Sequence, residues 1–336
     1  MSSEPLSQWP GLGCVEFKAD SPDFLVREGP TRQLRSFVVL LCISLLFSSP
    51  TSAVGQADAS KSAAKPDQRY LVIRTDDAGM SHSVNMALEK LIATGLPISV
   101  SVMFPTPWYQ ETVDILKRHP EVSVGIHLTL NSEWKNYRWG PVLGRTAVPS
   151  LVDADGYFFP SAADLFKNNP NLGEVEKELR AQVERAVKSG LKIDYLDYHM
   201  GTVRQRPEFL AIAEKLAKEY GLGMSQYFGE TSLDPQYEAA PPNKIDSLVV
   251  MVDHLESPYN LVVTHVGIDN EELGALLDMN TSGPLPDMSK NRQGELNALT
   301  SPRFAEAVKA RNVRLITYRQ LIQMQGLQSM RRPGGF

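Results

Sequence analysis

Cysteine is almost absent from this 336-residue chain, which contains only Cys14 and Cys42. Both precede the point at which we expect an N-terminal segment to be removed, so the mature protein is predicted to contain no cysteine. Disulfide and thiol chemistry are then excluded for it. Leu41 directly before Cys42 does not suit a lipoprotein cleavage site, so no lipid anchor is predicted.

A surplus of basic residues and a glycine-rich phosphate loop are also lacking. The formal net charge is -5, which argues against a nucleic-acid partner. No glycine-rich loop follows the first predicted strand, which weakens a nucleotide-binding reading. Hydrophobic residues make up 42% of the chain and charged residues 22%, enough to build a sizeable core.

The apolar run at residues 37–47 is too short to span a bilayer as a helix. Arginines precede it, and the small-residue triplets Thr51–Ala53 and Gly55–Ala57 follow it as cleavage sites. Residues 1–57 are therefore predicted to hold an unrelated preface and a secretory signal peptide. The expected location is secreted or periplasmic, with no stable membrane partner after cleavage. A retained N-terminal membrane anchor is the alternative.

Residues 58–68 are small and polar and are predicted to form a linker to a folded domain at 69–325, with a flexible tail at 326–336. Strand-like and helix-like segments alternate in that domain. Strands are predicted at 70–75, 98–103, 122–128, 193–197, near 223, at 261–264 and at 314–317. Helices are predicted at 83–93, 110–118, 174–189, 207–220, 244–255, 294–310 and from 319. This α/β alternation predicts a distorted (β/α) barrel of about seven parallel strands.

The first predicted strand ends in two adjacent carboxylates, Asp76 and Asp77. Adjacent residues on a strand point to opposite faces, but at the end of a buried strand both side chains can reach one mouth. Two acids there are costly unless a cation binds or one of them holds a proton. The pair is a candidate site, and capping of the next helix by Asp77 is the alternative.

Three of the six histidines, His127, His199 and His265, follow the ends of predicted strands. Active sites of β/α barrels gather at these ends, so the histidines and the acid pair are expected to converge. Two histidines and a carboxylate form a recurrent ligand set for a catalytic divalent metal. We therefore predict a metal ion, zinc or magnesium, at Asp77, His127 and His199. Asp76 would lie close enough to take a proton from its water.

Several ordered motifs support one family resemblance. They are Arg74–Ser81, Val84–Asn85 with Gly95, Ser99–Met103, Gly125–Leu128, Asp197–His199, Val263–Gly267 and Arg292–Leu296. Together they resemble the YdjC/ChbG family of carbohydrate deacetylases over about residues 69–322. The resemblance implies a deacetylase-type β/α barrel and a metal-dependent enzyme, with Asp77, His127 and His199 as metal ligands. It also implies that Asp76 is the base and that His265 is a second acid/base or a group that stabilises the intermediate.

The sequence departs from the family pattern beside the third ligand. Gly201 and Val203 stand where many members carry further histidines, and Tyr198 stands in place of serine. The metal set is retained, but the substrate pocket is expected to differ. A diacetylated chitobiose, the best-known substrate of the family, is therefore not assigned to this chain.

The predicted substrate side combines charged and aromatic residues. Arg74 is expected to keep Asp76 ionised, with a surface position as the alternative, and His82 lies in the turn after the first strand. The Arg-x-x-Glu-Leu resemblance adds Arg292. Trp108, Trp134 and Trp139 lie in predicted loops, where aromatic faces suit a sugar ring. The alternative is that the tryptophans hold down the long irregular segment 131–171.

These observations predict a hydrolase that removes acetyl groups from an N-acetylated or O-acetylated carbohydrate, with a water held by the metal attacking the acetyl carbonyl. The expected partner is an acetylated mono- or oligosaccharide, and a homodimer is a candidate assembly. One alternative is hydrolysis of another amide or ester at the same site, since a fold does not fix a substrate. The other is a carbohydrate-binding barrel with weak catalysis.

Overall fold

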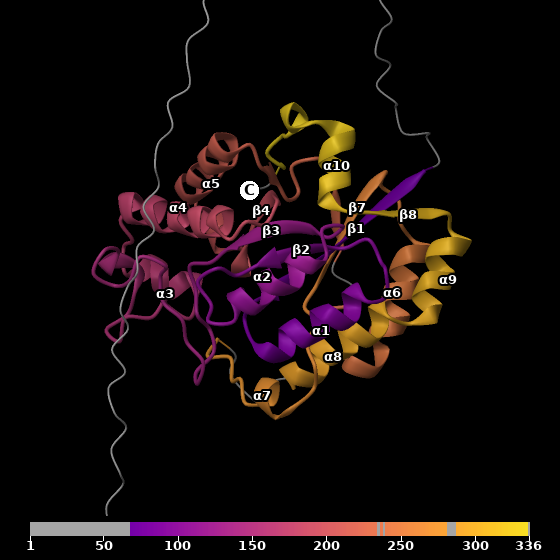
Figure 1. The fold of residues 1–336 in the computed structure, drawn as a ribbon, viewed down its shortest axis with the longest axis horizontal. Coiled ribbons are helices and arrows are strands. Elements are labelled where there is room, and N and C mark those ends of the chain that lie inside the picture. The colour runs from indigo at the N-terminus through magenta and orange to yellow at the C-terminus, as the bar shows by residue number, and fades with distance from the viewer. Residues whose placement is uncertain (1–67, 234–235, 238, 281–286, 335–336) are drawn as a thin grey trace, which may run out of the picture. The chain divides into compact units, whose positions relative to one another are not determined.

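A curved sheet of parallel strands lies at the centre of the fold, with helices around it (Figure 1). The computed structural model describes residues 68–233, 236–237, 239–280 and 287–334, all within the unit Ser60–Phe336. The predicted signal peptide and most of the predicted linker lie outside these residues. Among the described residues, no helix is long and apolar enough to cross a membrane.

The described residues form an eight-stranded sheet, of which seven strands follow the order β5-β4-β3-β2-β1-β7-β6. Its strands are β1 (Arg69–Ala78), β2 (Ser99–Val102), β3 (Ser123–Leu128), β4 (Ile193–Tyr198), β5 (Gly223–Met224), β6 (Thr231–Leu233), β7 (Tyr259–Thr264) and β8 (Val313–Ile316). Every pairing is parallel. Among these strands no pairing joins β5 to β6, so the sheet is a half-barrel. The α/β fold of about seven parallel strands is confirmed.

Strand β1 has neighbours on both edges. It pairs with β7 along Tyr70–Thr75. On its other edge β8 pairs with the first half of β1 and β2 with the second half. A parallel strand with neighbours on both sides is expected to be buried throughout. Nine of its ten residues are buried, which places the carboxylates at its end inside the protein.

The helices surround the sheet, with α4 and α5 beside β3 and β4 and with α9 beside β8 (Figure 1). They are α1 (His82–Ile92), α2 (Tyr109–Arg118), α3 (Ala162–Lys167), α4 (Leu172–Lys188), α5 (Pro207–Tyr220), α6 (Lys244–Asp253), α7 (Glu271–Gly274), α8 (Met288–Leu299), α9 (Pro302–Ala310) and α10 (Tyr318–Gln325).

The single helix predicted at 294–310 is wrong. The structure has two helices there, α8 and α9, because Pro302 cannot continue a helix and instead occupies the start of the next one. The Ser301 side chain caps α9 by accepting from the Arg303 N–H. Helix α8 begins earlier than predicted, at Met288, where the Asp287 side chain caps it by accepting from the Lys290 N–H, and it therefore includes Arg292.

The two faces of β1 pack into two hydrophobic clusters. Leu71 and Ile73 belong to the larger cluster, whereas Tyr70 and Val72 belong to a smaller one with Tyr195 and Tyr318. The even-numbered row continues along β1 to Arg74 and Asp76, because side chains alternate along a strand. The half-barrel therefore changes from an aromatic layer to a charged layer towards the strand ends.

The segment predicted as a flexible tail contacts the barrel in its described part. The Arg331 N–H donates to the Tyr227 carbonyl (2.9 Å), and Arg332 forms an ion pair with Glu214 (2.5 Å). The irregular stretch 131–171 contains a short 3-10 turn at Pro149–Leu151, helix α3 and an isolated antiparallel bridge between Val152 and Phe158.

Candidate metal centre

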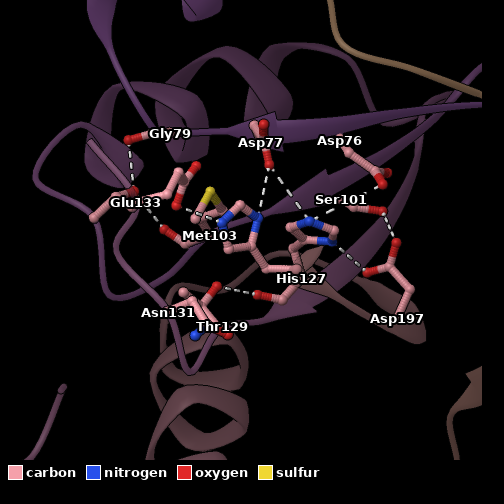
Figure 2. Close-up of polar contacts among 12 residues, drawn as sticks. Asp76, Asp77, Gly79, Ser101, Met103, His127, Thr129, Asn131, Glu133 and Asp197 are labelled. Atoms are coloured by element: carbon pink, nitrogen blue, oxygen red, sulfur yellow. Dashed lines mark hydrogen bonds and ion pairs between the residues drawn. The ribbon is translucent and has the colours of Figure 1, made fainter. Parts of the chain in front are cut away.

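Asp76 and Asp77 face the same mouth because the backbone turns between them. Asp77 has a φ of 62°, a left-handed conformation that is costly for aspartate and that often occurs at functional sites. Both side chains are buried. Asp76 lies beside Asp77 in Figure 2, although the two residues are neighbours on a strand.

The two predicted ligand histidines converge on a single oxygen of Asp77. His127 Nε2 lies 3.4 Å from Asp77 Oδ1, and His199 Nδ1 lies 3.2 Å from the same atom (Figure 2). One ligand atom from each of the three residues falls within 4.8 Å of the others, and all three residues are buried. The structure brings together the three residues that the sequence predicts as a metal site.

Each histidine meets a second carboxylate through its other ring nitrogen. His127 Nδ1 lies 3.0 Å from Asp197 Oδ1, and His199 Nε2 lies 3.0 Å from Glu133 Oε2. An ionised carboxylate only accepts hydrogen bonds, and Asp197 and Glu133 lie closer to the rings (3.0 Å) than Asp77 does (3.2–3.4 Å), which favours a hydrogen on the nitrogen that faces Asp197 or Glu133. In a neutral imidazole the lone pair then lies on the nitrogen that faces Asp77. This is the arrangement expected of metal-ligating histidines.

The charges of the cluster also fit a divalent cation. Four buried carboxylates, on Asp76, Asp77, Glu133 and Asp197, face two guanidinium groups, which leaves two negative charges when the histidines are neutral. One divalent ion or two protons would balance them. Burial lowers the pKa of His127, but Asp197 and Asp76 outweigh it and raise the value to about 10. Likewise, Glu133 and Asp77 outweigh burial and raise the pKa of His199 to about 9.

Arg74 holds the carboxylate beside the ligand set. Its Nε and Nη2 donate to the two oxygens of Asp76, both at 2.7 Å, and its Nε also lies 2.9 Å from Asp197 Oδ2. Its Nη1 donates to Ser225 Oγ, which forms a hydrogen bond with the Tyr318 hydroxyl. Arg74 is buried, so the alternative of a surface position is wrong. A bidentate guanidinium keeps its partner carboxylate oriented.

Arg292, predicted on the substrate side, contacts the candidate ligand set. Its Nη2 lies 2.6 Å from Asp77 Oδ2, so Asp77 directs one oxygen to Arg292 and the other to the histidines. Burial tends to raise the pKa of Asp77, but the Arg292 guanidinium and the nearby His127 and His199 rings hold it well below its usual range. Arg292 Nε and Nη1 are buried without a hydrogen-bond partner, beside the Trp134 ring.

His265 lies next to the acid pair along the sheet. Thr264, the last residue of β7, pairs with Thr75 on β1. The next residues along the two strands are His265 and Asp76, so their backbones are neighbours. Its N–H donates to Glu295 Oε2 (2.6 Å), and its half-buried ring packs edge-on against Tyr237. The structure places its backbone at the mouth, and its ring is not among the groups that contact Asp77.

The remaining predicted residues divide into inner and outer positions. Trp134 and Trp139 are buried, and the Trp139 ring meets His199 edge-on at 6.2 Å between centroids. Trp108 is 38% exposed and packs against His82, whose Nδ1 contacts Glu111 (2.8 Å). Trp134 and Trp139 therefore support the packing alternative for the long segment. Trp108 and His82 lie on an accessible rim.

Sequence reasoning missed the carboxylates behind the histidines. Asp197 appeared only within a motif, and Glu133 was not singled out. Alternation along the predicted strand 193–197 puts Asp197 two residues before His199, which was a usable signal. Nothing in the local pattern of Glu133 distinguishes it from a surface acid. Ser101, which donates to Asp197 (2.7 Å), likewise has no local sequence pattern that indicates this role.

The fold and this cluster define a class: a parallel β/α half-barrel with a buried Asp-His-His set suited to a metal. The chain belongs to the YdjC-like family, whose model matches residues 70–310. The family resemblance seen in the motifs is thereby confirmed.

Similar proteins cover most of this chain. A carbohydrate deacetylase from Brevibacillus brevis is 28% identical over 265 residues, covering 75% of this chain and 99% of its own. A carbohydrate deacetylase from Enterococcus faecalis is 25% identical and covers 75% and 98%. A crystal structure described as a cellobiose-phosphate cleavage protein, from Enterococcus faecalis V583, superposes with a TM-score of 0.64 at 25% identity, covering 76% of this chain and 99% of its own.

Proposed function

We propose that this protein is a metal-dependent carbohydrate deacetylase that removes an acetyl group from an N-acetylated or O-acetylated sugar. The observation that carries the proposal is the convergence of His127 Nε2 and His199 Nδ1 on Asp77 Oδ1, with Asp76 beside them. The names of the relatives support the sugar and the acetyl group as substrate class.

Asp77, His127 and His199 would hold the metal. When bound, a divalent ion lowers the pKa of water and polarises an acetyl carbonyl. Asp76 is placed to accept the proton that water loses, because its Oδ2 lies 4.0 Å from His127 Nε2 at the edge of the ligand set. Arg74 fixes the orientation of Asp76 by donating to both of its oxygens, which keeps the carboxylate of the proposed base directed at the ligand set.

A departing amine needs a proton, and His265 is the proposed donor. It lies directly after β7, beside β1, and histidine is the side chain that most often serves as a general acid. The sugar would enter over the rim that carries Trp108 and His82, since an exposed aromatic face suits a sugar ring.

The test combines metal analysis with acetate release from a panel of acetylated sugars. Asp77→Ala and His127→Ala are expected to lose bound metal and activity together. Asp76→Asn is expected to keep metal and fold while turnover falls about 10²- to 10⁴-fold, the usual contribution of a general base. Asp114→Asn, at an exposed position on α2, is the control. Normal turnover in Asp76→Asn, or unchanged metal content in Asp77→Ala, would refute these roles.

The same panel separates the alternatives. Release of acid from non-sugar amides or esters, with no acetate from sugars, would indicate a different hydrolase at this site. Sugar binding without hydrolysis, with and without added divalent metal, would indicate a binding protein.

A further inference from the structure

We propose that Glu133 is a positioning residue of the metal centre, which holds His199 in the orientation and tautomer that a metal ligand requires. The inference rests on the proposed metal site and adds a residue to it. Glu133 would do for His199 what Asp197 does for His127.

The geometry around the two histidines is closely matched. Each ring has a carboxylate oxygen 3.0 Å from one nitrogen and Asp77 Oδ1 at 3.2–3.4 Å from the other. Figure 2 shows Glu133 and Asp197 on opposite sides of His127, and the contact partners are His199 for Glu133 and His127 for Asp197. Glu133 and His199 are each 4% exposed, so water competes little for this hydrogen bond.

Glu133 is positioned by chain segments that are remote in sequence. Its carbonyl accepts from the Met279 N–H (2.8 Å), and the Lys135 N–H donates to the Leu277 carbonyl (2.8 Å). Between these contacts Trp134 forms an isolated antiparallel bridge with Asp278. Residues 133–135 and 277–279 thus form a short two-stranded clamp. The clamp fixes the backbone from which the Glu133 side chain reaches His199.

The physical consequence is a gain in metal affinity. A carboxylate on the outer nitrogen makes the inner nitrogen more basic and removes the rotational freedom of the ring, and loss of such a partner typically weakens metal binding about 10- to 100-fold. A role limited to packing would depend on the volume of the side chain and not on its charge.

The experiment compares full-length wild type, Glu133→Gln and Glu133→Ala. Zinc affinity is measured by competition with a chromophoric chelator, and the Tm of each metal-free protein is measured in parallel. We expect Glu133→Gln, which keeps the volume, to bind zinc about 10-fold or more weakly, and Glu133→Ala to bind it more weakly still. Affinity unchanged in Glu133→Gln would overturn the proposal.

Glu178→Gln is the matched control. Glu178 is also a fully buried glutamate that holds the same irregular segment, since it accepts from the Val142 and Leu143 N–H groups, but it contacts none of the ligand residues. We expect its zinc affinity to equal that of wild type. An equal loss in both variants would assign the effect to the segment and refute a specific role for Glu133.

Two further results separate this inference from the metal site itself. Wild type that binds no zinc would refute the proposed metal centre, whereas wild type and Glu133→Gln binding zinc equally would refute only the role of Glu133. If Glu133→Gln does not fold, Glu133→Asp replaces it, because it keeps the charge and withdraws it by one methylene. Its affinity is expected to be reduced, and wild-type affinity would overturn the proposal.

Discussion

Two different arginines hold the two adjacent carboxylates of β1. Arg74 donates hydrogen bonds to both oxygens of Asp76. Arg292 contacts only one oxygen of Asp77, and the other oxygen faces the two histidines. The turn at Asp77, with its positive φ, makes this division feasible. One carboxylate is thus tethered beside the ligand set and the other completes it, which is a division of roles that two equivalent surface acids would not show.

The raised pKa values of His127 and His199 predict how metal-free stability depends on pH. Both groups have folded values, about 10 and about 9, above the ordinary 6.5. Their stabilising contribution is therefore complete below about pH 6.5 and is lost as pH rises through 9 and 10. The Tm of chelator-treated protein is expected to fall from pH 7 to pH 10. The rise in Tm on adding zinc is expected to grow over the same range, because fewer protons must be displaced.

A metal-free Tm that stays level from pH 7 to pH 10 would contradict this prediction. His127→Asn provides the check, because it removes one of the two titrating rings. Its decline in Tm should be smaller than that of wild type.

The burial of Arg74 could have been predicted from the sequence. It lies two residues before Asp76 on one strand, so alternation puts both side chains on the same face. The sequence related Arg74 to Asp76 but left a surface position open, which this alternation argues against. The position of Glu133 could not have been predicted, because it depends on pairing with residues 277–279. No local sequence pattern indicates that pairing. Sequence thus predicts the groups at strand ends better than the groups that support them.

At the level of the strands, β3 depends on a glycine for the packing of the inner layer. A Cβ on Gly125 would lie 2.3–2.7 Å from three ring atoms of Tyr195 on β4. Tyr195 is fully buried, and its hydroxyl contacts Ser101 (2.9 Å), which donates to Asp197. Gly125 therefore leaves room for the ring that supports the partner of His127.

Gly125→Ala is expected to destabilise the protein by about 1–3 kcal/mol, the usual cost of an overpacked core. It is also expected to weaken zinc binding, because the displaced ring disturbs Ser101 and Asp197. Chemical denaturation and zinc competition measure the two effects. Gly274→Ala is the control, since an added Cβ there has open space. Equal stability of the two variants would show that β4 adjusts without cost.

The order and type of most elements followed from periodicity, and the errors have local causes. Helix α5 has the predicted bounds, Pro207–Tyr220, because proline starts it and Gly221 ends it in a left-handed conformation. Strand β6, at Thr231–Leu233, was missed because three residues carry too little pattern. The break at Pro302 was missed because the predicted helix 294–310 ran through a proline, which cannot continue a helix.

For the whole molecule, alternation of strands and helices predicts a parallel sheet but not how far it curls. Closure depends on the edge strands, and β5 and β6 are too short to be specified by their sequence. Alternation also cannot tell that residues 133–135, after β3, pair with residues 277–279, after β7. Such contacts between loops follow no local period, which explains why the candidate metal ligands at strand ends were predictable and Glu133, which lies in a loop, was not.

The N-terminal 57 residues carry a prediction about the whole chain that is independent of the barrel. Every residue of the proposed metal centre lies between Arg74 and Arg292, so removal of a signal peptide would leave the centre intact. Expression of the full chain in a bacterium should yield exported protein whose intact mass corresponds to cleavage after Ala53 or Ala57. Leu40→Asp, which interrupts the apolar run 37–47, should leave the uncleaved chain in the cytoplasm. Full-length wild-type protein in the membrane fraction would instead support the retained anchor.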